Sequence, residues 1–272
     1  MVKDYPCPRT MNASASQIAA TESLLAFWRD AGVDACFEDA PVDRTFVPAP
    51  PEQKATLKAV ASVTAPTDFS GAVAEARRLA AEASDLDALK DAIAAFTGCP
   101  LHEMGAKQAV FARGDPKAPI LVIGEGPGAD EDAQGAPFVG RAGKLLDRML
   151  DAAGLLDKVF ITNTVFWRPP GNRTPTPQEQ MVCAPLVERA FALIRPKAVL
   201  LLGAASAKSV LKTDEGIMKM RGQWREWRLN EGDVSAPVLP TLHPAFLLRQ
   251  PMAKRLAWAD MLELAARLDT AD

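Results

Sequence analysis

The sequence predicts an α/β protein: a three-layer α/β/α sandwich with a four-stranded parallel sheet, preceded by a helical N-terminal extension. Two observations carry this prediction. After residue 117, four short and nearly continuous apolar runs alternate with segments of helical periodicity. Before residue 70, the chain has one helical pattern followed by a proline-rich stretch. Short apolar strands separated by helices are typical of a parallel sheet that is covered on both faces.

The four predicted strands are Ile120–Gly124, Val159–Asn163, 199–203 and 238–241. Helical patterns span residues 141–153, 177–194, 204–212 and 253–268. In open parallel sheets, ligands bind outside the carboxyl ends of the strands. The functional site is therefore expected where these four strands end.

The N-terminal part has a different texture. Residues 15–31 predict an amphipathic helix, and residues 40–66, which include five prolines, predict an irregular arm. Residues 70–97 predict two alanine-rich helices, the second capped by Ser84 and ended by Gly98. We expect two parts: an extension over residues 1–70 and an α/β/α domain over residues 71–272.

Composition excludes a membrane protein and leaves the partner open. The chain is 48% hydrophobic and 24% charged, no apolar run has the length of a membrane span, and the N-terminus lacks the apolar core of a signal peptide. We therefore expect a cytoplasmic protein. The net charge is −3, but residues 1–99 hold 9 Lys and Arg against 14 Asp and Glu, whereas residues 100–272 hold 22 against 20. The mildly basic larger part is compatible with a nucleic-acid partner and equally with simple solubility.

The first predicted strand ends in a glycine-rich loop, Gly124-Glu125-Gly126-Pro127-Gly128, that permits close backbone approach to a ligand. A dinucleotide is the obvious rival ligand. The last glycine of the G-x-G-x-x-G fingerprint is replaced by alanine at position 129, and the proline and the acidic run 130–132 disfavour a pyrophosphate. We therefore set a nucleotide cofactor aside.

This loop continues to Phe138 and to a small-residue helix start that carries Arg141 and Lys144. Such a helix start suits a phosphate, and the aromatic ring before it could stack on a base. The alternative is a core phenylalanine followed by an ordinary helix N-terminus.

The second and fourth predicted strands also end in polar residues. Asn163 offers an amide donor and acceptor that match O4 and N3–H of uracil, or it caps the next turn. His243 could donate a hydrogen bond to a developing anion. Leu247 and Leu248 beside Arg249 predict either an apolar tip that wedges into a base stack or an ordinary core pair.

Three long motifs together resemble those of the uracil-DNA glycosylases of family 4. Residues 124–144 (GEGPGADEDAQGAPFVGRAGK) are similar to that family's GEAPGxxEDxxGxPFVGRAG. Residues 162–173 (TNTVFWRPPGNR) are similar to its TNxVKCRPPGNR, and residues 241–251 (TLHPAFLLRQP) to its HPSYLLRNP. Residues 175–177 and 219–224 also resemble the family, and the similarity covers roughly residues 95–265.

The resemblance implies a monofunctional enzyme of base-excision repair. It would flip deoxyuridine out of DNA and hydrolyse the N-glycosidic bond, leaving an abasic site. The implied partner is uracil-containing DNA, single- or double-stranded, and we expect a monomer. The implied uracil-binding residues are Gly126, Phe138, Asn163 and His243: the phenylalanine stacks on the base, the asparagine reads its edge, and the histidine hydrogen-bonds O2.

The resemblance also implies catalytic and DNA-binding sets. The catalytic residues would be His243 with Glu125, Glu131 and Asn172, the last three placing the water. Family 1 enzymes have a water-activating aspartate where this chain has Gly126, so Glu125 takes that role by elimination. The implied DNA-binding residues are Arg141, Lys144, Arg173, Leu247 and Arg249, with the leucine helping to hold the duplex open.

One departure concerns a cofactor. Family 4 enzymes bind a 4Fe–4S cluster through four cysteines, and the matching positions here are Cys99, His102, Trp167 and Cys183. Histidine replaces cysteine in some iron–sulfur centres, but an indole cannot ligate iron. We therefore predict no metal and no cofactor, with a 4Fe–4S cluster as the alternative. The other two cysteines, Cys7 and Cys36, have no context that supports ligation.

Two rival functions stay open. A non-catalytic module that binds uracil or abasic DNA is compatible with the lost cluster ligands and the missing aspartate. A variant that traps the sugar on a histidine is disfavoured, because residues 163–190 contain none. An unrelated α/β hydrolase would need a G-x-S-x-G nucleophile motif, which the chain lacks.

Overall fold

The computed structural model describes Glu22, residues 69–230 and residues 233–269. The predicted helix over 15–31 (apart from Glu22, which is helical) and the proline-rich arm over 40–66 lie outside the described residues. The proposed boundary at residue 70 therefore stays a prediction.

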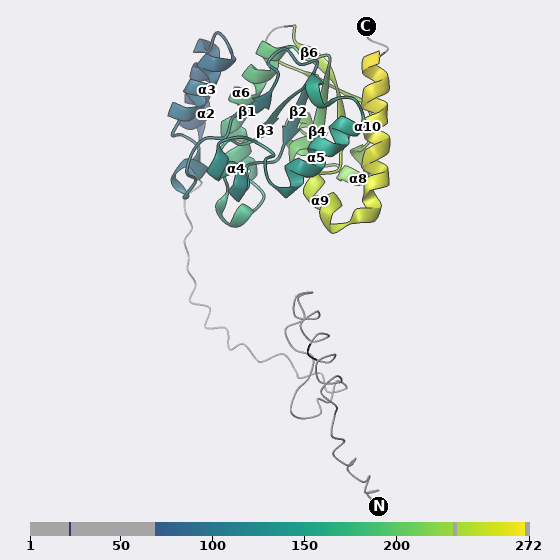
Figure 1. Cartoon of the computed structure of the whole chain (residues 1–272). Coiled ribbons are helices and arrows are strands. Elements are labelled where there is room, and N and C mark those ends of the chain that lie inside the picture. Colours follow the sequence, from purple (N-terminus) through teal and green to yellow (C-terminus); the bar gives the residue numbers. More distant parts are fainter. Residues whose placement is uncertain (1–21, 23–68, 231–232, 270–272) are drawn as a thin grey trace, which may run out of the picture. The chain divides into compact units, whose positions relative to one another are not determined.

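A six-stranded sheet forms the centre of the fold (Figure 1). The strands are β1 (Ala112–Gly114), β2 (Ile120–Gly124), β3 (Val159–Asn163), β4 (Ala198–Leu202), β5 (Arg225–Arg228) and β6 (Ser235–Thr241), in the order β1-β3-β2-β4-β6-β5. The four central strands run parallel, as predicted, but β1 and β5 pair antiparallel at the two edges. The prediction of a four-stranded sheet was therefore wrong. The missed strands have only three and four residues, and β5 carries exposed charged side chains, which is one way in which sheet edges avoid further pairing.

The helices and turns connect these strands. The α-helices are α2 (Ser70–Glu82), α3 (Leu86–Ala95), α4 (Ala129–Gln134), α5 (Arg141–Ala152), α6 (Pro177–Ile194), α7 (Gly203–Leu211), α8 (Ile217–Met220), α9 (Pro244–Arg249) and α10 (Lys254–Asp269). The 3-10 turns are η1 (Pro100–Glu103), η2 (Leu156–Lys158), η3 (Pro170–Asn172) and η4 (Pro251–Ala253). None of the helices in the described ranges is long and apolar enough to cross a membrane.

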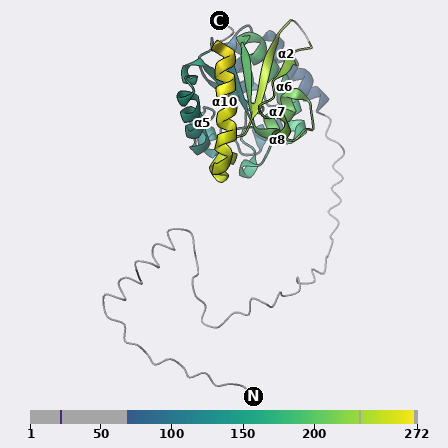
Figure 2. The same ribbon diagram turned by 90° about the vertical axis from the view of Figure 1, so that its right-hand side faces the viewer.

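Two apolar cores lie on opposite faces of the sheet. Because successive strand residues point to opposite faces, Leu121 and Ile123 pack with α2, α3, α6 and α7, whereas Ile120 and Val122 pack with α5 and α10. Figure 1 shows α2, α3 and α6 on one side of the strands, and Figure 2 brings α5 and α10 to the front. The described part is therefore a three-layer α/β/α arrangement.

Local capping explains where the N-terminal helices begin and end. Asp85, not the predicted Ser84, caps α3: its Oδ1 accepts a hydrogen bond of 2.8 Å from the Ala88 amide. The serine instead donates its hydroxyl to the Asp85 carboxylate. The helix ends at Ala95, three residues before the predicted stop. By contrast, α6 occupies the predicted residues, because Thr176 and Glu179 form a capping box before Pro177.

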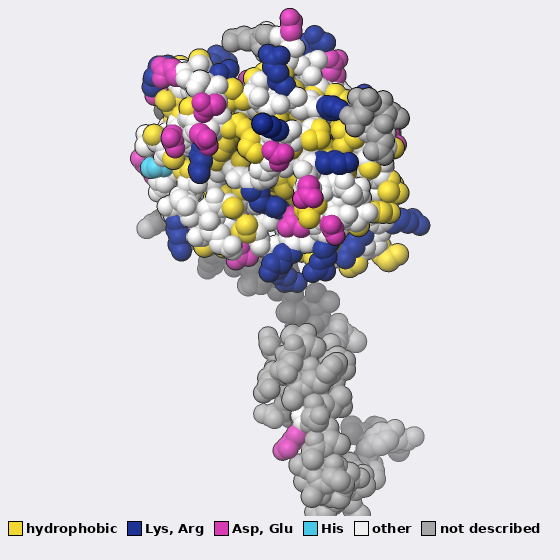
Figure 3. Space-filling model, turned by 45° about the horizontal axis from the view of Figure 1, so that its top comes forward, with side chains coloured by type: hydrophobic (Ala, Val, Ile, Leu, Met, Phe, Trp, Pro, Cys, Tyr) yellow, Lys and Arg dark blue, Asp and Glu magenta, His cyan; other side chains and the backbone are white. Residues whose placement is uncertain are grey.

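The surface carries mixed charge. On the face that Figure 3 brings forward, basic and acidic side chains are interspersed among apolar ones. This agrees with a net charge near zero rather than with one field of a single sign.

A buried ion pair ties the end of β6 to α10. Asp260 accepts hydrogen bonds from the Arg221 guanidinium and, at 2.6 Å, from the Thr241 hydroxyl at the last residue of β6. The Asp260 side chain is 2% exposed and the Arg221 side chain 17%. This network fixes the strand end that leads into the loop of His243.

Asp260→Ala is expected to lower the free energy of unfolding by about 3–5 kcal/mol, because it leaves a buried guanidinium without its counter-charge. Guanidinium-chloride unfolding measures the loss. The control is Arg228→Ala, whose ion pair with Glu226 is exposed and is worth about 0–1 kcal/mol. Equal losses in the two variants would contradict the assignment.

Candidate active site

A cavity of about 480 Å³ opens at the carboxyl ends of the parallel strands, as the fold class predicted. The loops after β2, β3 and β6 and the first turn of α5 form its walls. In Figure 1, α4 and α9, which follow β2 and β6, lie at the same lower end of the sheet. The predicted site residues that line it are Glu125, Gly126, Glu131, Phe138, Arg141, Asn172, Arg173, His243 and Arg249.

Phe138 holds an unusual backbone conformation at the cavity wall. Its φ is 55°, in the left-handed region, and its side chain is buried. Gly143, in the first turn of α5, packs directly against the Phe138 carbonyl, and a Cβ at that position would overlap it. The phenylalanine ring lies beside the His243 imidazole, with centroids 5.7 Å apart and planes inclined by 35°. This geometry leaves the ring where a planar ligand could stack.

Asn163, the last residue of β3, lies next to this ring. A Cβ on Gly124 would overlap both the Asn163 Oδ1 and the Phe138 ring, so these two side chains are close neighbours across the glycine. The asparagine is 1% exposed, yet neither its Oδ1 nor its Nδ2 has a hydrogen-bond partner among the described residues. A buried polar atom without a partner costs about 1–3 kcal/mol. Such an amide indicates a ligand that supplies both a donor and an acceptor.

His243 caps the helix that follows β6. Its Nδ1 accepts a hydrogen bond of 3.1 Å from the Ala245 amide. Burial, with a smaller contribution from the positive charge of Arg249, lowers the pKa of His243 to about 4. At neutral pH the ring is therefore uncharged, and because Nδ1 is an acceptor, the proton resides on Nε2. The side chain presents one N–H donor to the cavity.

The three residues implied to place a water differ in whether their side chains already have hydrogen-bond partners. The Glu131 carboxylate accepts hydrogen bonds from the amides of Gly128, Val139 and Gly140, at 3.1, 3.0 and 2.9 Å. It therefore organises the loop. The Asn172 Oδ1 accepts from Arg168 at 2.7 Å. The Glu125 carboxylate lines the cavity and has no hydrogen-bond or ionic partner in the described part of the chain.

The basic residues implied to bind DNA differ in their contacts with the rest of the chain. Arg141, Lys144 and Arg249 are exposed, the first and third at the cavity. Arg173 also lines the cavity, but its guanidinium forms an ion pair with the buried Glu179 carboxylate and donates hydrogen bonds of 2.6 and 2.9 Å to it. Although burial raises the pKa of Glu179, the hydrogen bonds from Arg173 and Thr176 outweigh it and lower that pKa.

The predicted exposed tip at Leu247 was wrong. Leu247 is fully buried and packs with Leu242 and Ala257, because it faces inward from the short helix α9. Leu248, the next residue, is 38% exposed. The side chain available for contact with a partner at this point is therefore Leu248.

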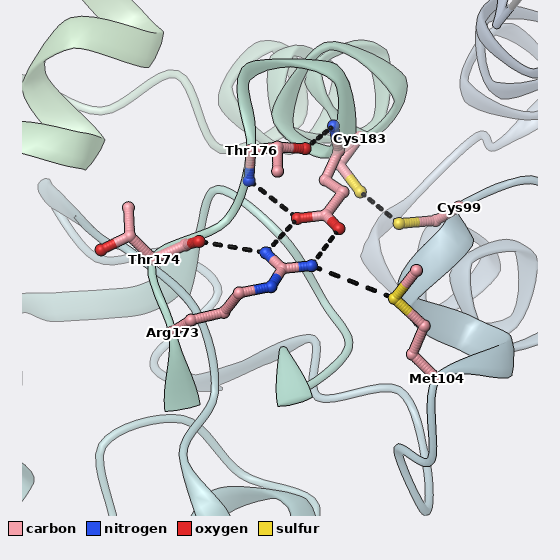
Figure 4. A network of polar contacts seen from close by, with 7 residues as sticks. Cys99, Met104, Arg173, Thr174, Thr176 and Cys183 are labelled. Atoms are coloured by element: carbon pink, nitrogen blue, oxygen red, sulfur yellow. Dashed lines mark hydrogen bonds and ion pairs between the residues drawn. The ribbon is translucent and has the colours of Figure 1, made fainter. Parts of the chain in front are cut away.

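The four positions of the implied cluster do come together. The thiol of Cys183 approaches that of Cys99 at 3.7 Å, and the His102 amide donates to the Cys99 carbonyl at 2.9 Å (Figure 4 shows the two thiols beside the Arg173 network). Trp167 is 2% exposed and meets the His102 ring edge-on, at a centroid distance of 5.9 Å. Cys99 and Cys183 are both buried free thiols, and the mutual hydrogen bond lowers the pKa of Cys99 and raises that of Cys183.

This set of side chains does not fit a four-cysteine cluster. Trp167 occupies one position with an indole, which offers no ligand atom. Within the ranges that the structure describes, no group of three or more His, Cys, Asp or Glu side chains could hold a metal ion. Cys7 and Cys36 lie outside those ranges.

One residue beside the Phe138 loop was not predicted from the sequence. Arg113, on the edge strand β1, donates to the carbonyl oxygens of Pro137 and Phe138. The strand is too short to show a periodic pattern, and the arginine stands outside every motif. The structure alone brings it to the site.

The protonation of His243 can be measured directly, since His102 is the chain's only other histidine. A ¹⁵N NMR titration should show the Nε2–H tautomer and a pKa of about 4. Because the unfolded chain takes up this proton near the ordinary value of 6.5, the free energy of unfolding should fall as pH drops from 6.5 toward 4. A titration midpoint at or above 6.5 would contradict the assignment.

Comparison with known proteins agrees with this geometry. The family model described as uracil DNA glycosylase superfamily matches residues 111–262. The Type-4 uracil-DNA glycosylase of Sulfurisphaera tokodaii is 37% identical over 185 residues, which cover 66% of this chain and 83% of the relative. Those of Thermotoga maritima and Saccharolobus solfataricus are also 37% identical, over 60% and 68% of this chain and 83% and 88% of their own lengths. The chain therefore belongs to the uracil-DNA glycosylase superfamily.

Proposed function

We propose that this chain is a uracil-DNA glycosylase, which flips deoxyuridine out of DNA and hydrolyses its N-glycosidic bond. The observation that carries the proposal is the buried, unpartnered amide of Asn163 beside the Phe138 ring and the neutral His243. Phe138 supplies a surface on which a base can stack, and the Asn163 amide can hydrogen-bond the edge of that base. His243 supplies a hydrogen-bond donor for an anion. An abasic site is left in the DNA, which makes the reaction the first step of base-excision repair.

Recognition of the base follows from donor and acceptor chemistry. A base must leave the stack before an enzyme can grip its Watson–Crick edge. With the flipped uracil stacked on Phe138, the Asn163 amide donates to O4 and accepts from N3–H, which satisfies both of its buried atoms. Cytosine presents an acceptor at N3 and a donor at N4, so it opposes the amide in this orientation at both atoms. Gly126 lines the same cavity, and a Cβ at this position would meet the Val165 side chain.

Cleavage requires stabilisation of the departing uracil anion. As the bond breaks, positive charge develops on the sugar and negative charge on the base. The Nε2–H of His243 donates to uracil O2, where that negative charge gathers. A hydrogen bond from the neutral imidazole to O2 is weaker in the uncharged substrate than in the departing anion. The hydrogen bond therefore stabilises the transition state more than the ground state.

Glu125 is the carboxylate that we propose positions the water. It lines the cavity and has no partner among the described side chains, whereas Glu131 is used by three backbone amides. Glu131 acts by ordering the loop, and Asn172, held by Arg168, contributes at the rim.

DNA contacts are proposed for exposed groups at the opening and on α5 and α9. Arg141, Lys144 and Arg249 would bind phosphates, and Leu248 replaces Leu247 as the residue that supports the opened duplex. Arg173 lies at the same rim, where its contact with Glu179 limits its reach. Action on both single and double strands, as a monomer in the cytoplasm, stays a prediction.

The test is release of uracil from a 5′-labelled oligonucleotide, followed by alkaline cleavage at the abasic site. His243→Ala should lower the single-turnover rate by roughly 10²–10³, as loss of one oxyanion donor does. His102→Gln is the matched control, because the second histidine does not line the cavity, and its rate should equal that of the wild type.

Absence of strand scission by the wild type on both single- and double-stranded substrate would overturn the proposal. A gel shift on uracil or abasic DNA without base release would favour the non-catalytic binding module instead.

Iron content tests the predicted absence of a 4Fe–4S cluster. We expect protein purified without oxygen to contain little iron and no visible colour, because Trp167 fills one ligand position. The double variant with His102→Cys and Trp167→Cys restores four cysteines and should gain colour and iron. About four iron atoms per wild-type chain would show the prediction to be wrong.

A further inference from the structure

Arg113 joins three elements around the Phe138 loop. Its Nε donates to the Pro137 carbonyl at 2.8 Å, and its Nη2 donates to the Phe138 carbonyl at 3.3 Å. The same Nη2 forms an ion pair of 2.5 Å with Asp147 on α5. The arginine comes from β1, so the guanidinium links the sheet edge, the loop and the helix.

The loop needs such a restraint because Phe138 adopts a φ of 55°. A residue with a Cβ avoids this region unless its surroundings impose it. Two charged groups impose it here from opposite sides of the residue. The Glu131 carboxylate binds the amides of Val139 and Gly140, which follow the phenylalanine. The Arg113 guanidinium binds the carbonyls of Phe138 and of the residue before it.

We propose that Arg113 is a positioning residue, which holds the Phe138 ring in the orientation that stacks on the flipped base. This inference rests on the proposed function. Without the guanidinium, the loop relaxes toward conformations in which the ring no longer faces the base. The apparent affinity for the flipped base then falls by the fraction of molecules that keep the stacking conformation. Bond cleavage in molecules that do bind is largely unchanged, because Asn163 and His243 lie outside the Phe138 loop, at the end of β3 and at the N-cap of α9.

The test measures binding to an oligonucleotide with one 2′-fluoro-2′-deoxyuridine. The fluorine disfavours positive charge on the sugar, so the base can be flipped but is hardly released. Arg113→Met should weaken binding to this oligonucleotide about tenfold, which corresponds to about one stacking-competent molecule in ten. Binding to undamaged DNA should not change. On cleavable substrate, KM should rise while kcat stays near the wild-type value.

A double-mutant cycle separates positioning from a general effect on the fold. In a Phe138→Leu background, Arg113→Met should cost less than twofold, because the ring that the arginine orients is gone. Arg228→Met is the matched control: this arginine lies on the opposite edge strand, β5, in an ion pair with Glu226, and its loss should change neither affinity. Arg113→Lys, which retains one point-like donor group, should show an intermediate loss of roughly threefold.

Three results would overturn the inference: an equal loss with and without the Phe138 ring, an equal loss on undamaged DNA, or wild-type binding by Arg113→Met. If Arg113→Met does not fold, the cycle with Arg113→Lys decides the question by the same criteria. Failure of the proposed function is distinguishable, because then the wild type itself would release no uracil.

Discussion

The backbone of Phe138 is the constraint on which the cavity depends. A left-handed conformation at a bulky residue costs of order 1–3 kcal/mol, so it persists only where neighbours over-determine it. Here the neighbours are a glycine on α5 that admits the carbonyl, a carboxylate on α4 that binds the following amides, and a guanidinium on β1. The ring is thereby brought beside the ends of β3 and β6. The contacts that hold this one strained residue thus bring together groups from four separate segments.

The polar groups of the site, like the Phe138 backbone, are held by their surroundings in states that cost free energy. His243 is kept neutral by burial and keeps its tautomer through a backbone amide, and Asn163 keeps both amide atoms unpaired. These arrangements weaken the isolated fold, and they are tolerated because the rest of the molecule is well packed, with two apolar cores and a buried Arg221–Asp260 pair. A site prepared in advance needs little reorganisation when charge develops.

Sequence patterns predicted what depends on local chemistry. The four central strands are near-continuous apolar runs, and α6 begins at a threonine–glutamate capping box, so both could be located closely. Edge strands β1 and β5 are short and charged, so they have no period to detect. Leu247 and Leu248 are adjacent in sequence, and only the packing of α9 decides which one is buried. The role of Arg113 depends on contacts 24 and 25 residues away, which no local pattern records.

The unpaired amide of Asn163 also bears on how normal DNA is spared. A repair enzyme meets a vast excess of ordinary bases, and an attractive pocket alone would retain many of them. A pocket whose buried polar atoms are left without partners by the wrong base rejects that base by several orders of magnitude. In the proposed reaction, discrimination against cytosine therefore arises from exclusion, because the edge of that base would leave the buried Asn163 amide without matching partners.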